Sequence, residues 1–138
     1  MSYLLDTNVV SELRKGRRAS PSVLRWFAET PDEDLWLSVL VVGELRQGAE
    51  RVRRRDPVIA GRLDRWIKKL VEDFDERIMV IDRATAERWG KLNVPDPLPV
   101  VDGLLAATAL THDLTLVTRN GSDVATTGVR ILDPFLSP

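Results

Sequence analysis

The sequence has no cysteine, one histidine and few aromatic side chains, which make up 6% of its 138 residues. The absence of cysteine excludes disulfide bonds and zinc sites built on thiolates. Because His112 is the only histidine, a histidine-rich metal centre is excluded too, and a Ser-His-Asp hydrolase would depend on that single residue. Any metal ion would therefore be held by oxygen atoms.

The chain also lacks a long hydrophobic run and an excess of either charge. Nowhere is an apolar run long enough to span a membrane, and the first ten residues show no signal-peptide pattern. We therefore expect a cytoplasmic protein without a membrane segment. With 43% hydrophobic and 30% charged residues, the composition is typical of one globular domain, which we expect to span residues 1–138.

The charge is unevenly distributed, although 20 basic and 21 acidic side chains give a net charge of -1. Residues 46–69 contain nine basic and three acidic side chains, a net charge of +6, so the rest of the chain carries -7. A segment of this kind either faces a polyanion or is the solvated face of a helix.

Apolar spacing predicts strands that alternate with helices. Short apolar runs predict strands at residues 3–5, 35–37, 78–81, 114–117 and 129–132, and helical spacing follows Asp6, Ser20, Ser38, Asp56 and Asp82 and covers 102–111. Residues 39–42 alone also suit a strand, but the spacing through Val52 favours a helix. Three prolines at 95, 97 and 99 mark a loop. We predict an α/β domain whose mainly parallel sheet of about five strands has helices on both faces.

Four acidic residues lie near the ends of the predicted strands. Asp6 ends the first strand and Glu44 lies in the helix after the second. Asp102 begins the helix before the fourth strand, and Asp123 follows that strand. In a parallel sheet these places share one edge, beyond the carboxyl ends of the strands, where ligands bind. No Arg or Lys is placed to neutralise each acid, so the cluster needs another explanation.

Clustered carboxylates take up protons or bind a cation. Two carboxylates about 4 Å apart repel by roughly 4 kcal/mol at an effective dielectric constant of about 20. Mg²⁺ or Mn²⁺ prefers such ligands and can activate water for phosphodiester hydrolysis. The side chains that would supply hydrogen bonds around the acids are Thr7, Asn8, Thr118 and Asn120. Taken singly, Asp6 and Asp102 could instead be helix caps, Glu44 a surface acid and Asp123 a turn residue.

Four segments match a known family in order and spacing over essentially the whole chain. They are YLLDTNVVSEL at 3–13, LSVLVVGELRQG at 37–48, DGLLAATAL at 102–110, and LVTRNGSDV at 116–124 followed by TGVRILDPF. This pattern resembles the PIN-domain ribonucleases, especially the VapC-type toxins of bacterial toxin–antitoxin pairs and their FitB-like branch. Val124 departs from the pattern, because these toxins often have an aromatic residue there.

The resemblance implies a parallel-sheet PIN fold and Mg²⁺- or Mn²⁺-dependent endoribonuclease activity. It places Asp6, Glu44 and Asp102 at the three core acids and Asp123 at the fourth. Thr7 and Asn8 match the polar positions after the first acid, and Thr118 and Asn120 match those of the last motif.

The resemblance also implies partners. The toxin would be a homodimer, and a cognate VapB-type antitoxin would hold it inactive in a heterotetramer or larger complex. The antitoxin would lie across the active-site groove and carry the operator-DNA contact. The side chains that could touch RNA phosphates or the antitoxin are Arg46, Arg51, Arg53, Arg54 and Arg55.

Other residues suggest structural roles. Trp26, Trp36, Trp66 and Trp89 lie in apolar patterns and suit the core or a dimer interface better than base stacking. His112 suits a helix C-cap better than a general base.

Rival functions fit the sequence less well. A receiver-like domain would need adjacent acids after the first strand and a late lysine, whereas Thr7 and Asn8 follow Asp6 and no lysine follows Lys91. A haloacid-dehalogenase-like phosphatase would need an aspartate at position 8. A catalytically silent PIN-like module that only binds an antitoxin stays open, although the presence of all four acids disfavours it.

Overall fold

The computed structural model describes residues 1–136, whose strands form one sheet in the order β3-β2-β1-β4-β5. The strands are β1 (Tyr3–Leu5), β2 (Leu35–Ser38), β3 (Ile78–Met79), β4 (Thr115–Val117) and β5 (Ile131–Leu132). Every neighbouring pair is parallel, and the register sets Leu4 opposite Trp36 on one side and Leu116 on the other. The predicted parallel α/β architecture is confirmed.

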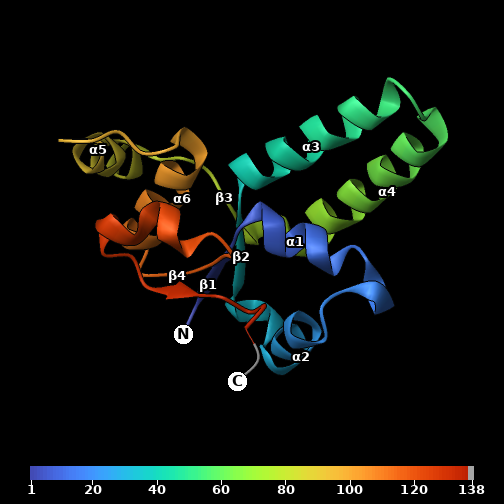
Figure 1. The fold of residues 1–138 in the computed structure, drawn as a ribbon, viewed down its shortest axis with the longest axis horizontal. Coiled ribbons are helices and arrows are strands. Elements are labelled where there is room, and N and C mark those ends of the chain that lie inside the picture. The colour runs from blue at the N-terminus through green and yellow to red at the C-terminus, as the bar shows by residue number, and fades with distance from the viewer. Residues whose placement is uncertain (137–138) are drawn as a thin grey trace.

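In residues 1–136, six α-helices connect and cover the strands (Figure 1). They are α1 (Thr7–Leu13), α2 (Pro21–Glu29), α3 (Val39–Arg53), α4 (Pro57–Phe74), α5 (Arg83–Leu92) and α6 (Val100–Thr111). Helices α1 and α2 lie on one side of the sheet and α5 and α6 on the other, while α3 and α4 form a hairpin that projects from the body. Five helices begin at the residues that the sequence predicts, because the side chains of Asp6, Ser20, Ser38, Asp56 and Asp82 each accept a backbone N–H of the first turn.

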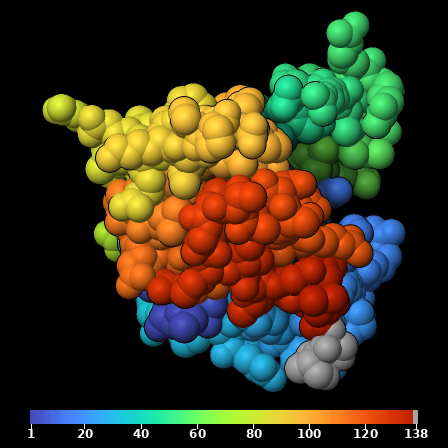
Figure 2. Space-filling model, turned by 60° about the vertical axis from the view of Figure 1, so that its left-hand side comes forward, coloured from blue at the N-terminus to red at the C-terminus, as the bar shows by residue number. Residues whose placement is uncertain are grey.

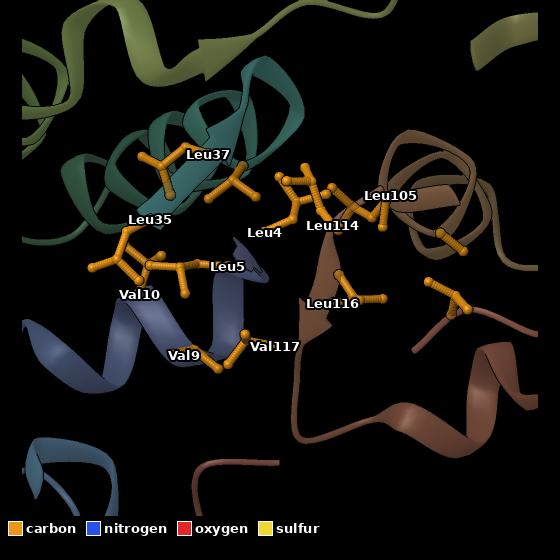
Figure 3. Close-up of a cluster of buried hydrophobic side chains, with 14 of the residues drawn as sticks. Leu4, Leu5, Val9, Val10, Leu35, Leu37, Leu105, Leu114, Leu116 and Val117 are labelled. Atoms are coloured by element: carbon orange, nitrogen blue, oxygen red, sulfur yellow. The ribbon is translucent and has the colours of Figure 1, made fainter. Parts of the chain in front are cut away.

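The hydrophobic core lies on both faces of β1, because successive side chains of a strand point to opposite faces. Leu4 packs toward Leu105 of α6, and Leu5 packs toward Val10 of α1 (Figure 3). Both leucines are fully buried. The carboxyl end of β1, and with it Asp6, is therefore fixed between two packed layers.

The structure corrects several predicted boundaries. The third strand ends at Met79 instead of residue 81, and Val80 is 65% exposed. The fourth and fifth strands are also shorter than predicted, and α6 begins two residues earlier than expected, at Val100. The 3-10 helix η4 (Gly121–Thr127) was not predicted. Within residues 1–136, no helix is both long and apolar enough to cross a membrane.

Candidate metal and active site

Asp6 lies at the carboxyl end of the central strand and is 6% exposed. Its Oδ1 accepts the backbone N–H of Thr7 at 2.7 Å, so it is the N-cap of α1. Its Oδ2 accepts the Thr118 hydroxyl at 2.7 Å and the Asn8 side-chain amide at 3.2 Å. Asp6 is therefore a helix cap, as the alternative interpretation of the sequence expected. Its second carboxylate oxygen faces Thr118, the residue that follows β4.

The polar residues around Asp6 form a connected network. The Asn8 amide also donates to Thr118 Oγ1 at 3.3 Å, and the Asn8 carbonyl accepts the backbone N–H of Arg119 at 3.2 Å. The backbone N–H of Asn120 donates to Thr118 Oγ1 at 3.0 Å. Three of the four predicted polar residues, Thr7, Asn8 and Thr118, therefore contact the acids or their neighbours through side chains, whereas Asn120 joins the network through its backbone N–H.

Glu44 comes to the same edge from α3. Its Oε1 accepts a short hydrogen bond from the Thr7 hydroxyl, which ties the first turn of α1 to α3. The helix after Ser38 is needed for this contact, since Glu44 lies in the second turn of α3. Thr7 therefore donates to two acids, through its hydroxyl to Glu44 and through its backbone N–H to the cap residue Asp6.

Asp102 and Asp123 complete the group on the α6 side. Asp102 lies in the first turn of α6 and is half-buried, whereas Asp123 lies in η4 and is exposed. Burial raises the pKa of the Asp102 carboxyl above its usual value. The negative charges of Asp6, Asp123 and Glu44 raise the same pKa further. The other three acids are therefore close enough to Asp102 for their charges to act on its carboxyl group.

Two glycines allow close packing of the segments that carry Asp102 and Asp123. A Cβ at Gly103 would lie 3.3 Å from both Leu98 and Trp89, so glycine after Asp102 lets α6 pack tightly on α5. A Cβ at Gly121 would lie 2.8 Å from Ile131, so glycine at the start of η4 lets that segment lie on β5. Val124 of η4 is buried in the core.

The donor chemistry of this group fits a hard divalent cation. Every donor is an oxygen, and none of the four acids has an Arg or Lys partner at ion-pair distance in the described chain. As the side chains stand in residues 1–136, however, no three acidic or histidine groups converge into a metal site. Asp6 and Glu44 are turned onto their hydroxyl and amide partners instead.

The basic segment is partly neutralised within the fold. Arg53 of α3 pairs with Glu50 and with Asp64 of α4, both at 2.7 Å, and Arg46 also pairs with Asp64. Arg53 holds the pKa of Asp64 below its usual value, and Arg46 adds to this effect. Arg46 and Arg53 therefore join the two helices of the hairpin, and the other three predicted contact arginines, Arg51, Arg54 and Arg55, are exposed.

Glu12 is a buried acid that the sequence analysis missed. Its carboxylate, 9% exposed, accepts the Lys15 ammonium at 2.9 Å and the backbone N–H of Ser20 at 2.8 Å. The hydrogen bond from Lys15, and then that from Ser20, lowers the pKa of Glu12. The sequence signal for this ion pair is Lys15, three residues after Glu12, a spacing at which side chains on a helix meet. Glu12 thus fixes the turn between α1 and α2.

His112 and the tryptophans take structural positions. His112 is the C-cap residue of α6, and its Nε2 lies 3.1 Å from Asp82 of α5. It is about 15 Å along the helix from Asp102. Trp26, Trp36 and Trp66 pack against the core, and Trp26 makes an edge contact with Tyr3 at 5.3 Å.

The structure is a parallel α/β domain with four acidic residues near the carboxyl ends of its strands, the edge at which ligands bind in such folds. Within that class the chain belongs to the PIN domain family, whose model matches residues 3–127.

Similar proteins cover nearly the whole chain. Toxin FitB of Neisseria gonorrhoeae is 32% identical over 141 residues, covering 96% of this chain and 97% of FitB. The VapC ribonuclease Y4jK of Sinorhizobium fredii is 33% identical, covering 96% of each chain. A solved structure of FitAB bound to an IR36 DNA fragment superposes with a TM-score of 0.88 at 25% identity, covering 99% of this chain and 97% of the other. FitAcB from Neisseria gonorrhoeae gives a TM-score of 0.81 at 29% identity, covering 96% and 98%.

Proposed function

We propose that this chain is a metal-dependent endoribonuclease and the toxin of a toxin–antitoxin pair. The observation that carries the proposal is the grouping of four acids at one edge of the sheet. Burial raises the pKa of Asp102, and the charges of Asp6, Asp123 and Glu44 raise it further. Two relatives named as a toxin and as a ribonuclease, each covering 96% of this chain, support it.

Asp6, Glu44, Asp102 and Asp123 would hold Mg²⁺ or Mn²⁺. When bound, such an ion supplies an activated water and neutralises charge on the leaving oxygen of a phosphodiester. The repulsion between the carboxylates would then become attraction to a shared cation.

The chain's own residues prepare the site. Thr118 and Asn8 fix Oδ2 of Asp6, and the Thr7 backbone fixes Oδ1, so this carboxylate has one orientation before any ligand arrives. Thr7 holds Glu44 beside it. Asp102 keeps its proton to a higher pH than an ordinary aspartate and must lose that proton to act as a ligand.

The proposed partners follow from the solved relatives. Structures of similar chains are FitAB and toxin–antitoxin complexes, one of them with a DNA fragment. We propose that a VapB-type antitoxin binds this chain, that operator DNA is contacted through the antitoxin, and that the toxin forms a homodimer.

The test is cleavage of total cellular RNA by the antitoxin-free protein with Mg²⁺ or Mn²⁺. We expect wild-type protein to cut RNA, and both a chelator and Asp6→Ala to abolish cutting. Equal cleavage by wild type and Asp6→Ala would contradict the site assignment. No cleavage by either protein would support the silent-module alternative.

A further inference from the structure

A cavity of about 590 Å³ lies between η4 and the loop that joins α5 to α6, residues 93–99, which we call the proline loop. Its volume is in the range of about 300 to 1,000 Å³ that binding sites for small ligands occupy. Asp123, one of the four acids, lines this cavity, and its charge also acts on Asp102. Figure 2 shows the yellow and orange surface of α5 and α6 lying against the orange-red surface of η4. The cavity therefore adjoins the proposed metal site and shares one of its carboxylates.

The proline loop is held in shape by its own residues. Its three prolines restrict φ, and the side chain of Asn93 closes the loop on itself. The Asn93 carbonyl oxygen accepts the backbone N–H of Leu98 at 2.9 Å, and the Asn93 amide donates to the Trp89 carbonyl at 2.7 Å. The Pro99 carbonyl accepts the backbone N–H of Gly103 at 2.8 Å, which ties the loop to α6. Since the loop is ordered before a ligand arrives, binding in the cavity costs little conformational entropy.

The lining of the cavity combines apolar and polar side chains. The apolar ones are Leu92, Val94, Pro95, Pro97, Leu98 and Pro99. The polar ones, besides Asp123, are Lys91, Asp96, Ser122 and Thr126. Within residues 1–136, none of these four polar side chains has an ion-pair or hydrogen-bond partner. The cavity therefore offers apolar contact together with donors and acceptors that the fold itself does not use, which suits a flat ligand with polar edges.

We propose that the cavity binds one unstacked nucleobase of the RNA, next to the phosphodiester that is cut, and thereby selects the base at the cleavage site. This inference rests on the proposed ribonuclease function. Single-stranded RNA is read in this way, through splayed-out bases whose edges receive hydrogen bonds. Lys91 can donate to an oxygen or ring nitrogen of the base, and Asp96 can accept from a base N–H. Because Asp123 belongs to both sites, a phosphate bound at the acids brings its neighbouring base to the cavity.

Two residues of η4 provide a matched pair of variants. Thr126 and Ala125 are both exposed, but only Thr126 lines the cavity. Thr126→Phe should therefore fill the cavity without disturbing the core, whereas Ala125→Phe adds a ring of the same size outside the cavity.

A second pair of variants tests the charged groups. K91Q/D96N leaves the cavity open and removes its unpaired ammonium and carboxylate groups. K68Q/E72Q is the matched control, because it removes the same charges from exposed positions on α4, outside the cavity.

The first arm of the test sequences the cut ends of a random single-stranded RNA pool after partial cleavage with Mg²⁺ or Mn²⁺. We expect wild-type protein to favour one base at a position beside the cut. Thr126→Phe and K91Q/D96N should each reduce that preference by about tenfold, the discrimination that a well-bonded base supplies. Ala125→Phe and K68Q/E72Q should keep the wild-type preference.

The second arm needs no cleavage. Wild-type protein in EDTA is titrated with adenosine, guanosine, cytidine and uridine, which carry no phosphate for the acids to repel, and followed by NMR. We expect at least one nucleoside to give saturable shifts of the backbone amide signals of Val94, Asp96 and Ser122. Thr126→Phe should abolish these shifts, and Ala125→Phe should not.

If wild-type protein cuts RNA and Thr126→Phe keeps the wild-type base preference, the inference is overturned while the proposed function stands. Loss of a dimer in Thr126→Phe, with that preference unchanged, would assign the cavity to a contact between subunits instead. If wild-type protein cuts no RNA, the proposed function fails and the nucleoside titration decides the cavity. Saturable shifts that Thr126→Phe abolishes then support a base site, and their absence overturns it.

Discussion

Thr118→Val should destabilise the protein through loss of a single hydroxyl. The Thr118 side chain is 1% exposed and donates to Asp6 Oδ2 at 2.7 Å while accepting the backbone N–H of Asn120. A buried hydrogen bond to a charged group contributes roughly 1.5 to 3 kcal/mol, and the variant also leaves the Asn120 N–H without its acceptor. We expect a loss of about 2 to 3 kcal/mol in the free energy of unfolding, or about 6 to 10 °C in Tm for a chain of this size.

Thr118→Ser is the matched control, because it keeps the hydroxyl and removes only a buried methyl, at about 1 kcal/mol. Urea unfolding in EDTA should be measured for both variants and again in an Asp6→Ala background. The cost of Thr118→Val should fall by more than about 1 kcal/mol when Asp6 is absent, since the two residues then no longer interact. Equal costs in both backgrounds would refute the argument that the hydroxyl acts on Asp6.

Three further predictions concern the acids, the hairpin and η4. Because the pKa of Asp102 is raised in the native state, its contribution favours folding below its ordinary pKa and is lost as pH rises through the native value. Asp102→Asn should therefore raise Tm at neutral pH, and the difference from wild type should vanish in acid. Calorimetry across a range of pH measures both. Arg53→Gln should lower Tm by breaking the contacts to Glu50 and Asp64, and less so in high salt, whereas Arg54→Gln should leave Tm unchanged. Gly121→Ala should cost roughly 1 to 3 kcal/mol in urea unfolding. Adding Ile131→Ala should reverse part of that loss, and no reversal would show that the clash with Ile131 is not the cause.

Features set by local sequence could be predicted well. Ser20 and Ser38 cap their helices through their own side chains, so a few neighbouring residues determine where each helix begins. Asp6 could be placed because it directly follows the apolar strand β1. The alternation of strands and helices then set the parallel sheet, and with it the edge at which the acids gather.

Features that depend on residues distant in the sequence could not be predicted. Val80 is as apolar as a strand residue, but β3 pairs with β2 only through Met79, opposite Ser38, where β2 ends. Counting charges predicted a basic segment but not which of its arginines form ion pairs. The packing of α4 on α3 brings Asp64 to Arg53, so this arginine is paired. The contact of Glu44 with Thr7 likewise depends on the packing of α3 against α1.

The most direct test of the central claim compares RNA cleavage and stability on the same samples of wild-type and Asp102→Asn protein. With Mg²⁺ or Mn²⁺, the account predicts that the variant is at least as stable as wild type and yet cleaves RNA slower by at least about a hundredfold, because one ligand of the site is lost. A stable Asp102→Asn protein that cleaves RNA at the wild-type rate would contradict it.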